Sequence, residues 1–317
     1  MKQETESEIE EILQRVSYCA IPIDWRTTNS FPGVGGRKGV RRGPGLDFLG
    51  TAIFKDGDDE RHINWVATAQ AADEEEIYKT IYRQRKELKA HIFVDISLSM
   101  DYGTERNTKR GVAAEVAASI HYALDKTRDK VGCTIYSGDT VIETLPTRSA
   151  RLNLIPALVN ILECERGEGL KFDPLPGNGL DKALSIMPGS RQLVFIISDF
   201  LNMSEADWEA LGNMAVVHDV VCIYVQDRRE RELPEPKGWM KRLYRFGYFL
   251  QIKDPSGESK WVWNNAKTRR RWTENWKAHE ARISAALADC NCQSLVLSTE
   301  EDEGAMNSVL SLFAGHV

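Results

Sequence analysis

The stretch His91-Ile92-Phe93-Val94-Asp95-Ile96-Ser97-Leu98-Ser99-Met100 decides the fold of this chain. Its apolar first half predicts a strand that is buried on both faces, and one carboxylate and two hydroxyls follow where that strand ends. A helix is predicted next, because a capping residue (Asn107 or Thr108) precedes apolar residues at helical spacing. A buried strand followed by a helix is typical of a parallel sheet covered on both faces. The helical apolar positions are Val112, Val116, Ile120 and Leu124.

A second apolar run, Leu193 to Ile197, ends in Ser198 and Asp199. In open sheets of parallel strands, ligands bind beyond the carboxyl ends of the strands. If Asp95 and Asp199 leave neighbouring strands, their carboxylates face one crevice and repel each other until a cation arrives. The sequence therefore predicts an oxygen-lined cation site built from Asp95, Ser97, Ser99 and Asp199.

These residues resemble the metal-ion-dependent adhesion site of von Willebrand factor A-type domains, which combines Asp-x-Ser-x-Ser, a Thr in a later loop and a further Asp. The loop Pro-Gly-Asn-Gly-Leu-Asp-Lys-Ala-Leu at 176–184 is similar to the family's Gly-Thr-x-Leu-x-x-Ala-Leu, with Asn178 at the Thr position. Asn178 departs from the pattern, and its longer side chain changes the loop geometry while keeping an oxygen ligand. The resemblance implies a doubly wound, mostly parallel six-stranded α/β sheet that binds Mg²⁺, or another divalent cation such as Ca²⁺ or Mn²⁺.

A second resemblance lies upstream, in Arg42 to Phe48, Asp56 to Trp65 and Ala67 to Ala69. These segments are similar to the signature that precedes the A-type domain in a bacterial family of unknown function, typically encoded beside MoxR-type AAA+ ATPases. That family usually has Asp where this chain has Asn64. The resemblance runs from about residue 15 to the C-terminus. It implies a non-catalytic, metal-dependent adaptor that binds a MoxR-type ATPase, or a client protein of that ATPase, through an acidic residue of the partner.

The domain organisation follows from Gly and Pro content. Residues 31–50 are dense in both, and a turn follows at 56–59, so we expect a small β-rich N-terminal module at 1–88. Within it, 73–89 suits either a helix or a strand, and the resemblance favours a strand. Residues 89–317 form the A-type domain, with an insertion at about 226–268 where the alternation of strand and helix breaks down.

The remaining elements of the larger domain alternate between strand and helix, which predicts an α/β fold. Within the insertion, Trp261 and Trp263 alternate with Val262, so a strand places both indoles on one face, where we expect them to cover the core. The predicted strands are 131–136, 140–145, 193–197, 220–225 and 294–297, with a hairpin over 247–263, and the predicted helices are 152–162, 180–187, 205–214, 271–289 and 302–313.

Composition limits the function classes. The net charge of −6 argues against nucleic acid as a partner, since such binding needs a strongly basic surface. The chain begins with polar, acidic residues and contains no run of about eighteen apolar residues, so we expect no membrane span and a cytoplasmic location. The cysteines form no Cys-x-x-Cys pair and are expected to be reduced thiols.

Two alternatives to the adaptor remain open. A Mg²⁺-dependent phosphohydrolase would use Asp95 as its nucleophile, but such enzymes normally carry a second Asp two residues later, where this chain has Ser97. A structural domain with a degenerate metal loop is the other alternative, and Asn178 supports it. The chain has no Gly-x-Ser-x-Gly or His-Glu-x-x-His motif, so serine hydrolase and zinc protease chemistry are not predicted.

Overall fold

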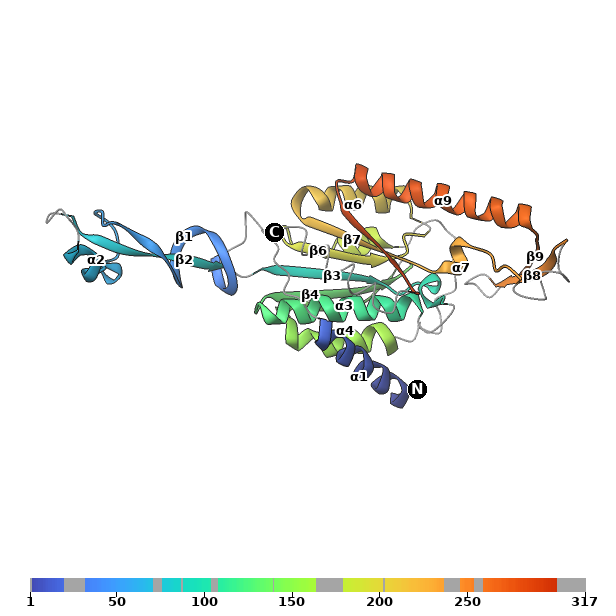
Figure 1. The fold of residues 1–317 in the computed structure, drawn as a ribbon, viewed down its shortest axis with the longest axis horizontal. Helices are drawn as coiled ribbons and strands as arrows, with labels where there is room; N and C mark the ends of the chain where they lie inside the picture. The colour runs from blue at the N-terminus through green and yellow to red at the C-terminus, as the bar shows by residue number, and fades with distance from the viewer. Residues whose placement is uncertain are drawn as a thin grey trace.

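A six-stranded, mostly parallel sheet forms the centre of the protein, as the sequence predicted (Figure 1). This is seen in a computed structural model that describes residues 2–19, 32–70, 76–86, 88–103, 108–138, 140–163, 179–201, 203–236, 246–253 and 259–300. The strand order is β10-β7-β6-β3-β4-β5. The strands are β3 (Lys89–Asp95), β4 (Lys130–Ser137), β5 (Thr140–Ser149), β6 (Leu193–Ser198), β7 (Asp219–Gln226) and β10 (Gln293–Ser298).

Strand β3 lies between β4 and β6 and pairs with both in parallel, which is why it reads as an uninterrupted apolar run. Strand β5 turns back beside β4 as an antiparallel edge strand, which confirms the predicted hairpin. Because β3 is a central strand, the Asp95 to Ser99 segment that follows it lies in the middle of the edge formed by the carboxyl ends of the parallel strands.

One face of the sheet is covered by α3 (Lys109–Lys126) and α4 (Ala150–Glu163), and α1 (Lys2–Cys19) packs on the outer side of these two helices (Figure 1). Thr108 caps α3 by accepting a hydrogen bond from the Gly111 amide at 3.0 Å, one of the two caps that the sequence offered. The apolar stripe predicted for this helix is buried, together with residues of β3 that point the same way: Ala90, Ile92, Val94, Val112, Val116, Ile120 and Leu124.

Helix α1 was not predicted, since a β-rich module was expected from residue 1. Its sequence is acidic, but Ile9, Ile12 and Val16 recur at helical spacing and are buried in the same core as α3 and α4. The acidic residues between them face solvent. The first helix therefore packs on α3 and α4, and the high charge of the segment hid a narrow apolar stripe.

The opposite face is covered by α5 (Leu180–Leu184), α6 (Glu205–Val217) and α9 (Ala266–Asp289). Ser204 and Asp207 form a reciprocal capping box at the start of α6. Asp207 also accepts a hydrogen bond at 3.0 Å from the amide of Asp181, which ties the beginning of α5 to α6. Asn178, which comes just before α5, and the predicted helix at 302–313 lie outside the described residues.

A two-stranded antiparallel arm projects away from the central sheet (Figure 1). It consists of β1 (Pro32–Ile53) and β2 (Tyr78–Lys86), with the short helices η1 (Glu60–His62) and α2 (Trp65–Ala69) at its tip. The ambiguous segment 73–89 therefore contains a strand, as the resemblance favoured. Asn64 caps α2 by accepting a hydrogen bond from the Ala67 amide at 3.0 Å. Within the described ranges, no helix is both long enough and apolar enough to cross a membrane.

The insertion carries a hairpin of β8 (Tyr248–Lys253) and β9 (Ser259–Asn264), followed directly by α9. The hairpin itself was predicted, but the expectation that its tryptophans cover the core is wrong. Trp261 and Trp263 are 65% and 42% exposed, because the hairpin extends beyond the edge of the sheet. Helix α9 begins at Ala266, slightly inside the predicted insertion boundary of 268.

Two histidines are buried on opposite sides of the central sheet: His121 belongs to α3, and His91 lies on the face of β3 that carries Phe93 and points away from α3. His91 bonds through Nε2 to Thr134 Oγ1 at 2.8 Å, and His121 bonds through Nδ1 to the Ala117 carbonyl at 2.8 Å. Gly132 lies beside His91, and a Cβ atom there would come within 2.5 Å of its Nδ1. Burial lowers the pKa of His91 and of His121 to about 4, so both rings are neutral at pH 7.

We expect the His121→Gln variant to change the acid sensitivity of the fold. The pKa of His121 is lower in the folded protein than in the unfolded chain, so its contribution to stability is present above about pH 6.5 and is lost as pH falls toward 4. The gap in unfolding free energy between wild type and variant should therefore narrow by about 3 kcal/mol from pH 7 to pH 4. Urea denaturation at several pH values measures this gap. Ile120→Val, a core change without a titrating group, should keep a constant gap.

Candidate functional site

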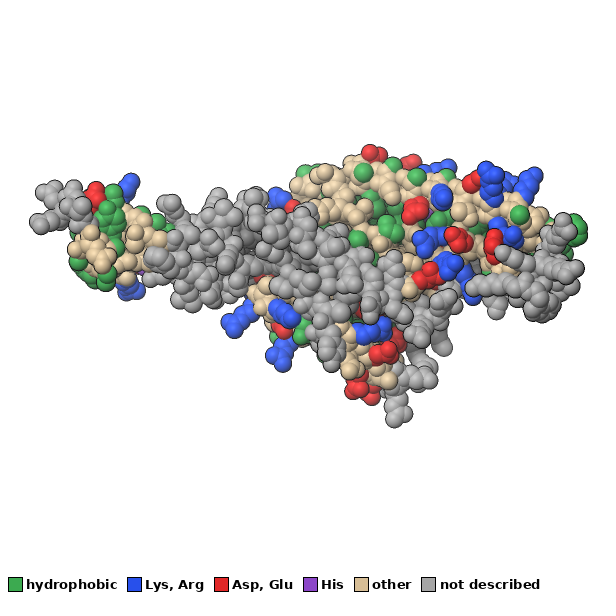
Figure 2. All heavy atoms as spheres, viewed as in Figure 1, with side chains coloured by type: hydrophobic (Ala, Val, Ile, Leu, Met, Phe, Trp, Pro, Cys, Tyr) green, Lys and Arg blue, Asp and Glu red, His purple; other side chains and the backbone are tan. Residues whose placement is uncertain are grey.

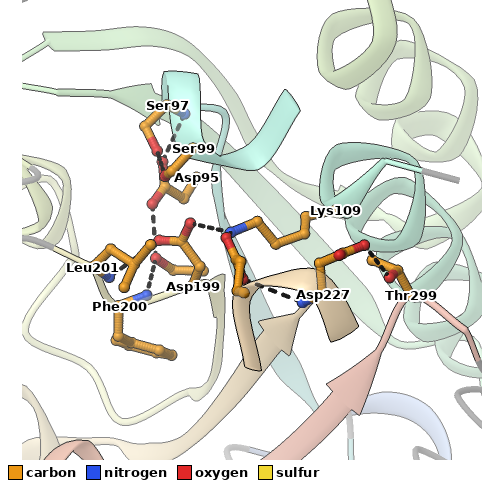
Figure 3. Close-up of polar contacts among 11 residues, drawn as sticks. Asp95, Ser97, Ser99, Lys109, Asp199, Phe200, Leu201, Asp227 and Thr299 are labelled. Atoms are coloured by element: carbon orange, nitrogen blue, oxygen red, sulfur yellow. Dashed lines mark hydrogen bonds and ion pairs between the residues drawn. The ribbon is translucent and has the colours of Figure 1, made fainter. Parts of the chain in front are cut away.

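Polar side chains from two neighbouring strand ends meet at the carboxyl edge of the sheet (Figure 3). Val94 of β3 pairs with Ile197 of β6 in parallel register, so Asp95 and Ser198 emerge side by side. Asp95 is almost fully buried. Its Oδ1 accepts a hydrogen bond from the Ser97 amide at 2.8 Å, and its Oδ2 accepts one from Ser198 Oγ at 2.7 Å. The predicted convergence of the two strand ends is therefore present.

The two hydroxyls of the Asp-x-Ser-x-Ser stretch point toward one another. Ser97 Oγ lies 3.0 Å from Ser99 Oγ, and both residues are half-buried (Figure 3). Ser99 belongs to the 3₁₀ turn η2 (Leu98–Asp101), and Ser97 directly precedes that turn. The turn holds both hydroxyls on the same side of the loop as the Asp95 carboxylate. Three of the five predicted ligands, Asp95, Ser97 and Ser99, are thus close together, and Asn178 lies outside the described residues.

Asp199 is aimed into the site by a sharp turn after β6. Phe200 adopts a left-handed backbone conformation with φ of 47°, which costs energy for a bulky residue. The Phe200 amide donates to Ser198 Oγ at 3.0 Å, and the Leu201 amide donates to Asp199 Oδ1 at 3.1 Å. Ser198 thereby links the turn to Asp95, a role that the sequence analysis did not assign to it.

A buried lysine, which the sequence analysis also missed, occupies the other side of Asp199. Lys109 is the first residue of α3, and its Nζ donates to Asp199 Oδ2 at 2.8 Å and to Glu230 Oε1 at 2.6 Å. Glu230 comes from the short helix α7 (Arg228–Arg231), which follows β7. The Lys109 side chain has no exposed surface. A lysine in the first turn of a helix opposes the helix dipole, and that anomaly is the sequence signal that could have identified it.

The charges of the site shift the pKa values of its members. Burial, together with the negative charge of Asp199, raises the pKa of Asp95 to about 7. Burial also raises the pKa of Glu230 above its ordinary value, against the opposing effect of Lys109. Burial disfavours the charged form of Lys109, but Asp199 and Glu230 outweigh that effect and raise its pKa. Lys109 is therefore a permanent ammonium, and Asp95 forms no ion pair within the part of the chain that the structure describes.

The donor set fits a hard divalent cation at Asp95, Ser97 and Ser99. The hydroxyl separation matches that of about 3.0 Å between adjacent oxygens in an octahedron with metal–oxygen distances of about 2.1 Å. Three carboxylates and one ammonium leave a net charge of −2 when all are ionised, which one divalent ion neutralises. Asp199 differs from the expectation, because Lys109 already occupies one of its oxygens. Within the described ranges, no three His, Cys, Asp or Glu side chains group as metal ligands, so a cation here depends on the serine hydroxyls.

The structure describes the side chains of four of the six cysteines. Cys133 and Cys222 are buried in strands as the apolar runs predicted, and Cys290 and Cys292 are half-buried near the end of α9. All four are free thiols.

The model of the DUF58 family, described as proteins of unknown function, matches residues 53–282. The chain is similar to the uncharacterized proteins Rv1480 of Mycobacterium tuberculosis and Mb1516 of Mycobacterium bovis. Each is 27% identical over 271 residues, which cover 84% of this chain and 79% of the relative.

Solved structures resemble the chain only distantly. BatB from Bacteroides thetaiotaomicron is 16% identical, with a TM-score of 0.42 over 72% of this chain and 99% of that chain. An aerotolerance-related membrane protein from Bacteroides fragilis is 15% identical, with a TM-score of 0.43 and the same coverage. These similarities carry no argument about function. The family match is decisive, because it spans well over half of the sequence: this chain belongs to the DUF58 family of proteins of unknown function.

Proposed function

We propose that this protein is a non-catalytic adaptor with a von Willebrand factor A-like domain, which binds a protein partner through a divalent cation at Asp95, Ser97 and Ser99. The observation that carries the proposal is the pair of serine hydroxyls, 3.0 Å apart, beside a buried carboxylate that forms no ion pair with any residue the structure describes. Without a cation, the ionised form of Asp95 is high in free energy, because the carboxylate is buried and lies near the negative charge of Asp199.

In this mechanism each residue of the site has a different role. Ser97 and Ser99 offer neutral oxygen ligands, and Asp95 supplies negative charge beside them. The Asp95 carboxylate is held in place by hydrogen bonds from the Ser97 amide and the Ser198 hydroxyl. Lys109 neutralises Asp199, so less anionic charge reaches the cation. When bound, the cation supplies an electrophilic position for a carboxylate of the partner. Asn178 would complete the ligand set from its loop.

The partner that we propose is a MoxR-type AAA+ ATPase, or a client protein that this ATPase remodels. This part of the proposal comes from the resemblance of the arm sequence to the signature described above. An acidic side chain on the partner would complete the coordination sphere. A non-catalytic role agrees with the placement of Ser97, a hydroxyl, where a phosphohydrolase would carry its second acid.

The decisive experiment is a Mg²⁺ titration that follows thermal unfolding and, in parallel, retention of a purified MoxR-type ATPase on the immobilised protein. Wild type should gain stability with Mg²⁺ and should retain the ATPase only without chelator. The Ser97→Ala/Ser99→Ala double variant should lose both responses. Ser185→Ala, at an exposed serine after α5, is the matched control and should keep both.

One observation favours a second candidate, a structural domain with no metal. The Lys109 ammonium already gives Asp199 a cationic partner from within the chain. On that alternative Mg²⁺ leaves the unfolding temperature of wild type unchanged, and ATPase retention does not respond to chelator. Phosphatase turnover that depends on Asp95 would instead support the phosphohydrolase.

A further inference from the structure

The β8–β9 hairpin presents large aromatic side chains to solvent. Phe249 pairs with Trp263 across the two strands, and Gln251 pairs with Trp261, so the three aromatic residues share one face of the hairpin. Phe249 and Trp263 pack edge to face with ring centroids 4.8 Å apart. Phe249, like Trp261, is 65% exposed, and Phe246, which precedes the hairpin, is 84% exposed. A cluster of this kind on a surface marks an interaction site.

Basic residues lie next to the hairpin in the sequence: most are in the first turns of α9, and Lys260 is on the face of β9 opposite to the aromatic residues. The segment 259–271 contains Lys260, Lys267 and the run Arg269 to Arg271, with no acidic residue, in a chain whose net charge is −6. Lys260, Lys267, Arg270 and Arg271 are exposed. Figure 2 shows Lys and Arg side chains gathered at the end of α9 that adjoins the hairpin. Among the described residues, the acidic contacts of the run are Glu235 with Arg269 and Glu274 with Arg270, both at the surface and therefore weak.

Within the described ranges, neither hydrophobic core includes a residue of the β8–β9 hairpin or of the N-terminal half of α9. In α9 the buried residues are Ile283 and Leu287, both in its C-terminal half, so the N-terminal half extends past the sheet and carries the hairpin outward (Figure 1). The projecting unit is nevertheless firmly attached. Trp272 Nε1 donates to the Glu230 carbonyl at 2.8 Å, and Asn264 Nδ2 donates to the Pro234 carbonyl at 2.9 Å.

We propose that the β8–β9 hairpin and the first turns of α9 dock this protein onto an anionic lipid bilayer surface. Tryptophan and phenylalanine side chains settle at the boundary between head groups and acyl chains, and adjacent Lys and Arg side chains are attracted to anionic head groups. An apolar peptide would account for the aromatic face but not for the cluster of positive charge beside it. A nucleic acid would account for the charge, but it would meet the repulsion of an acidic protein.

The attachment is peripheral, because the aromatic face is small and no described helix can span a bilayer. Trp272 joins α9 to Glu230, which also holds Lys109, so the docking surface is connected by hydrogen bonds to the candidate site. A protein held in this way would present the site close to the membrane surface. This inference stands independently of whether the site binds a cation.

Sedimentation with lipid vesicles tests the proposal on the full chain. Wild type should sediment with vesicles of phosphatidylcholine and phosphatidylserine, and much less with phosphatidylcholine alone. Trp261→Ser/Trp263→Ser should weaken binding at least tenfold through lost apolar contact. Neutralising Lys260, Lys267, Arg270 and Arg271 to Gln should weaken it by about fivefold for each charge. Raising the NaCl concentration should weaken wild-type binding, since exposed charges are screened.

Matched controls distinguish docking through the hairpin from nonspecific adsorption to vesicles and from misfolding. Trp65→Ser removes an equally exposed tryptophan from the tip of the arm, and Lys126→Gln/Arg128→Gln removes two exposed charges at the far end of α3; neither should change binding. Circular dichroism melting should show that the hairpin variants remain folded. The proposal is overturned if wild type does not bind anionic vesicles, if it binds neutral vesicles equally, or if Trp65→Ser is the variant that loses binding.

Discussion

Lys109→Met is expected to lower the free energy of unfolding by about 3–5 kcal/mol, the largest effect of any single substitution that we foresee. The methionine side chain fills a similar volume, so the loss comes from charge. Asp199 and Glu230 would remain buried without the ammonium that now lies 2.8 Å and 2.6 Å from their carboxylate oxygens. Urea denaturation at pH 7, followed by circular dichroism, measures the difference.

A double-mutant cycle identifies the cause of this loss. Lys109→Met/Glu230→Gln should recover part of the lost stability, because fewer unpaired charges remain buried. Lys126→Met, at an exposed lysine in the last turn of the same helix, should cost no more than about 1 kcal/mol. If Lys109→Met and Lys126→Met destabilise equally, the buried ion pairs do not hold the site together.

The same substitution should also change the response to cations. Without Lys109, Asp199 Oδ2 loses its ammonium donor and the net charge of the site becomes more negative, so Mg²⁺ should stabilise Lys109→Met more than it stabilises wild type. If Mg²⁺ stabilises neither protein, the three carboxylates do not attract a divalent ion, and the adaptor mechanism fails.

Asp95→Asn is expected to have two effects of opposite sign. It removes the carboxylate that would balance the cation, so the affinity for Mg²⁺ should fall at least a hundredfold, equivalent to about 2.7 kcal/mol. It also removes a buried negative charge that Asp199 repels, so the protein without metal should become more stable by about 2–4 kcal/mol at pH 8. The amide oxygen of Asn still accepts the Ser97 hydrogen bond, which keeps the loop in place.

The pH dependence of this gain follows from the direction of the shift. Because the pKa of Asp95 is raised to about 7 in the folded protein, the folded state binds this proton more tightly than the unfolded chain, and wild type loses stability as pH rises from about 4 through 7. The advantage of Asp95→Asn should therefore be small at pH 4 and reach its full value above pH 7. Chemical denaturation without metal, at pH 4 and pH 8, measures both ends. An equal difference at the two pH values would contradict the charge argument.

Much of the fold could be predicted because each signal is local. The run His91 to Val94 reads as a strand buried on both faces, and it is the central strand, β3. Thr108 and the apolar residues that follow predict a capped helix, and α3 begins at the next residue. Asp95 and Asp199 were expected together because parallel strands deliver their carboxyl ends to one edge.

Other features were not visible in the sequence because they depend on contacts between distant segments. Lys109 and Glu230 are 121 residues apart, and no local pattern reports that their side chains meet inside the protein. The tryptophans of β9 have the alternation of a half-buried strand, yet only the outward position of the hairpin decides that they face solvent. In α1, only packing against α3 and α4 shows that its narrow apolar stripe is used.

The sequence by itself determined which apolar runs form buried strands and which oxygen-bearing side chains follow those strands. Those properties depend on residues that are close in the sequence, through apolar periodicity and helix caps. The tertiary structure decided the charge balance of the site and the exposure of the hairpin. Both depend on which segments exclude water from one another, and a buried ammonium or an exposed indole arises only when the whole chain has packed.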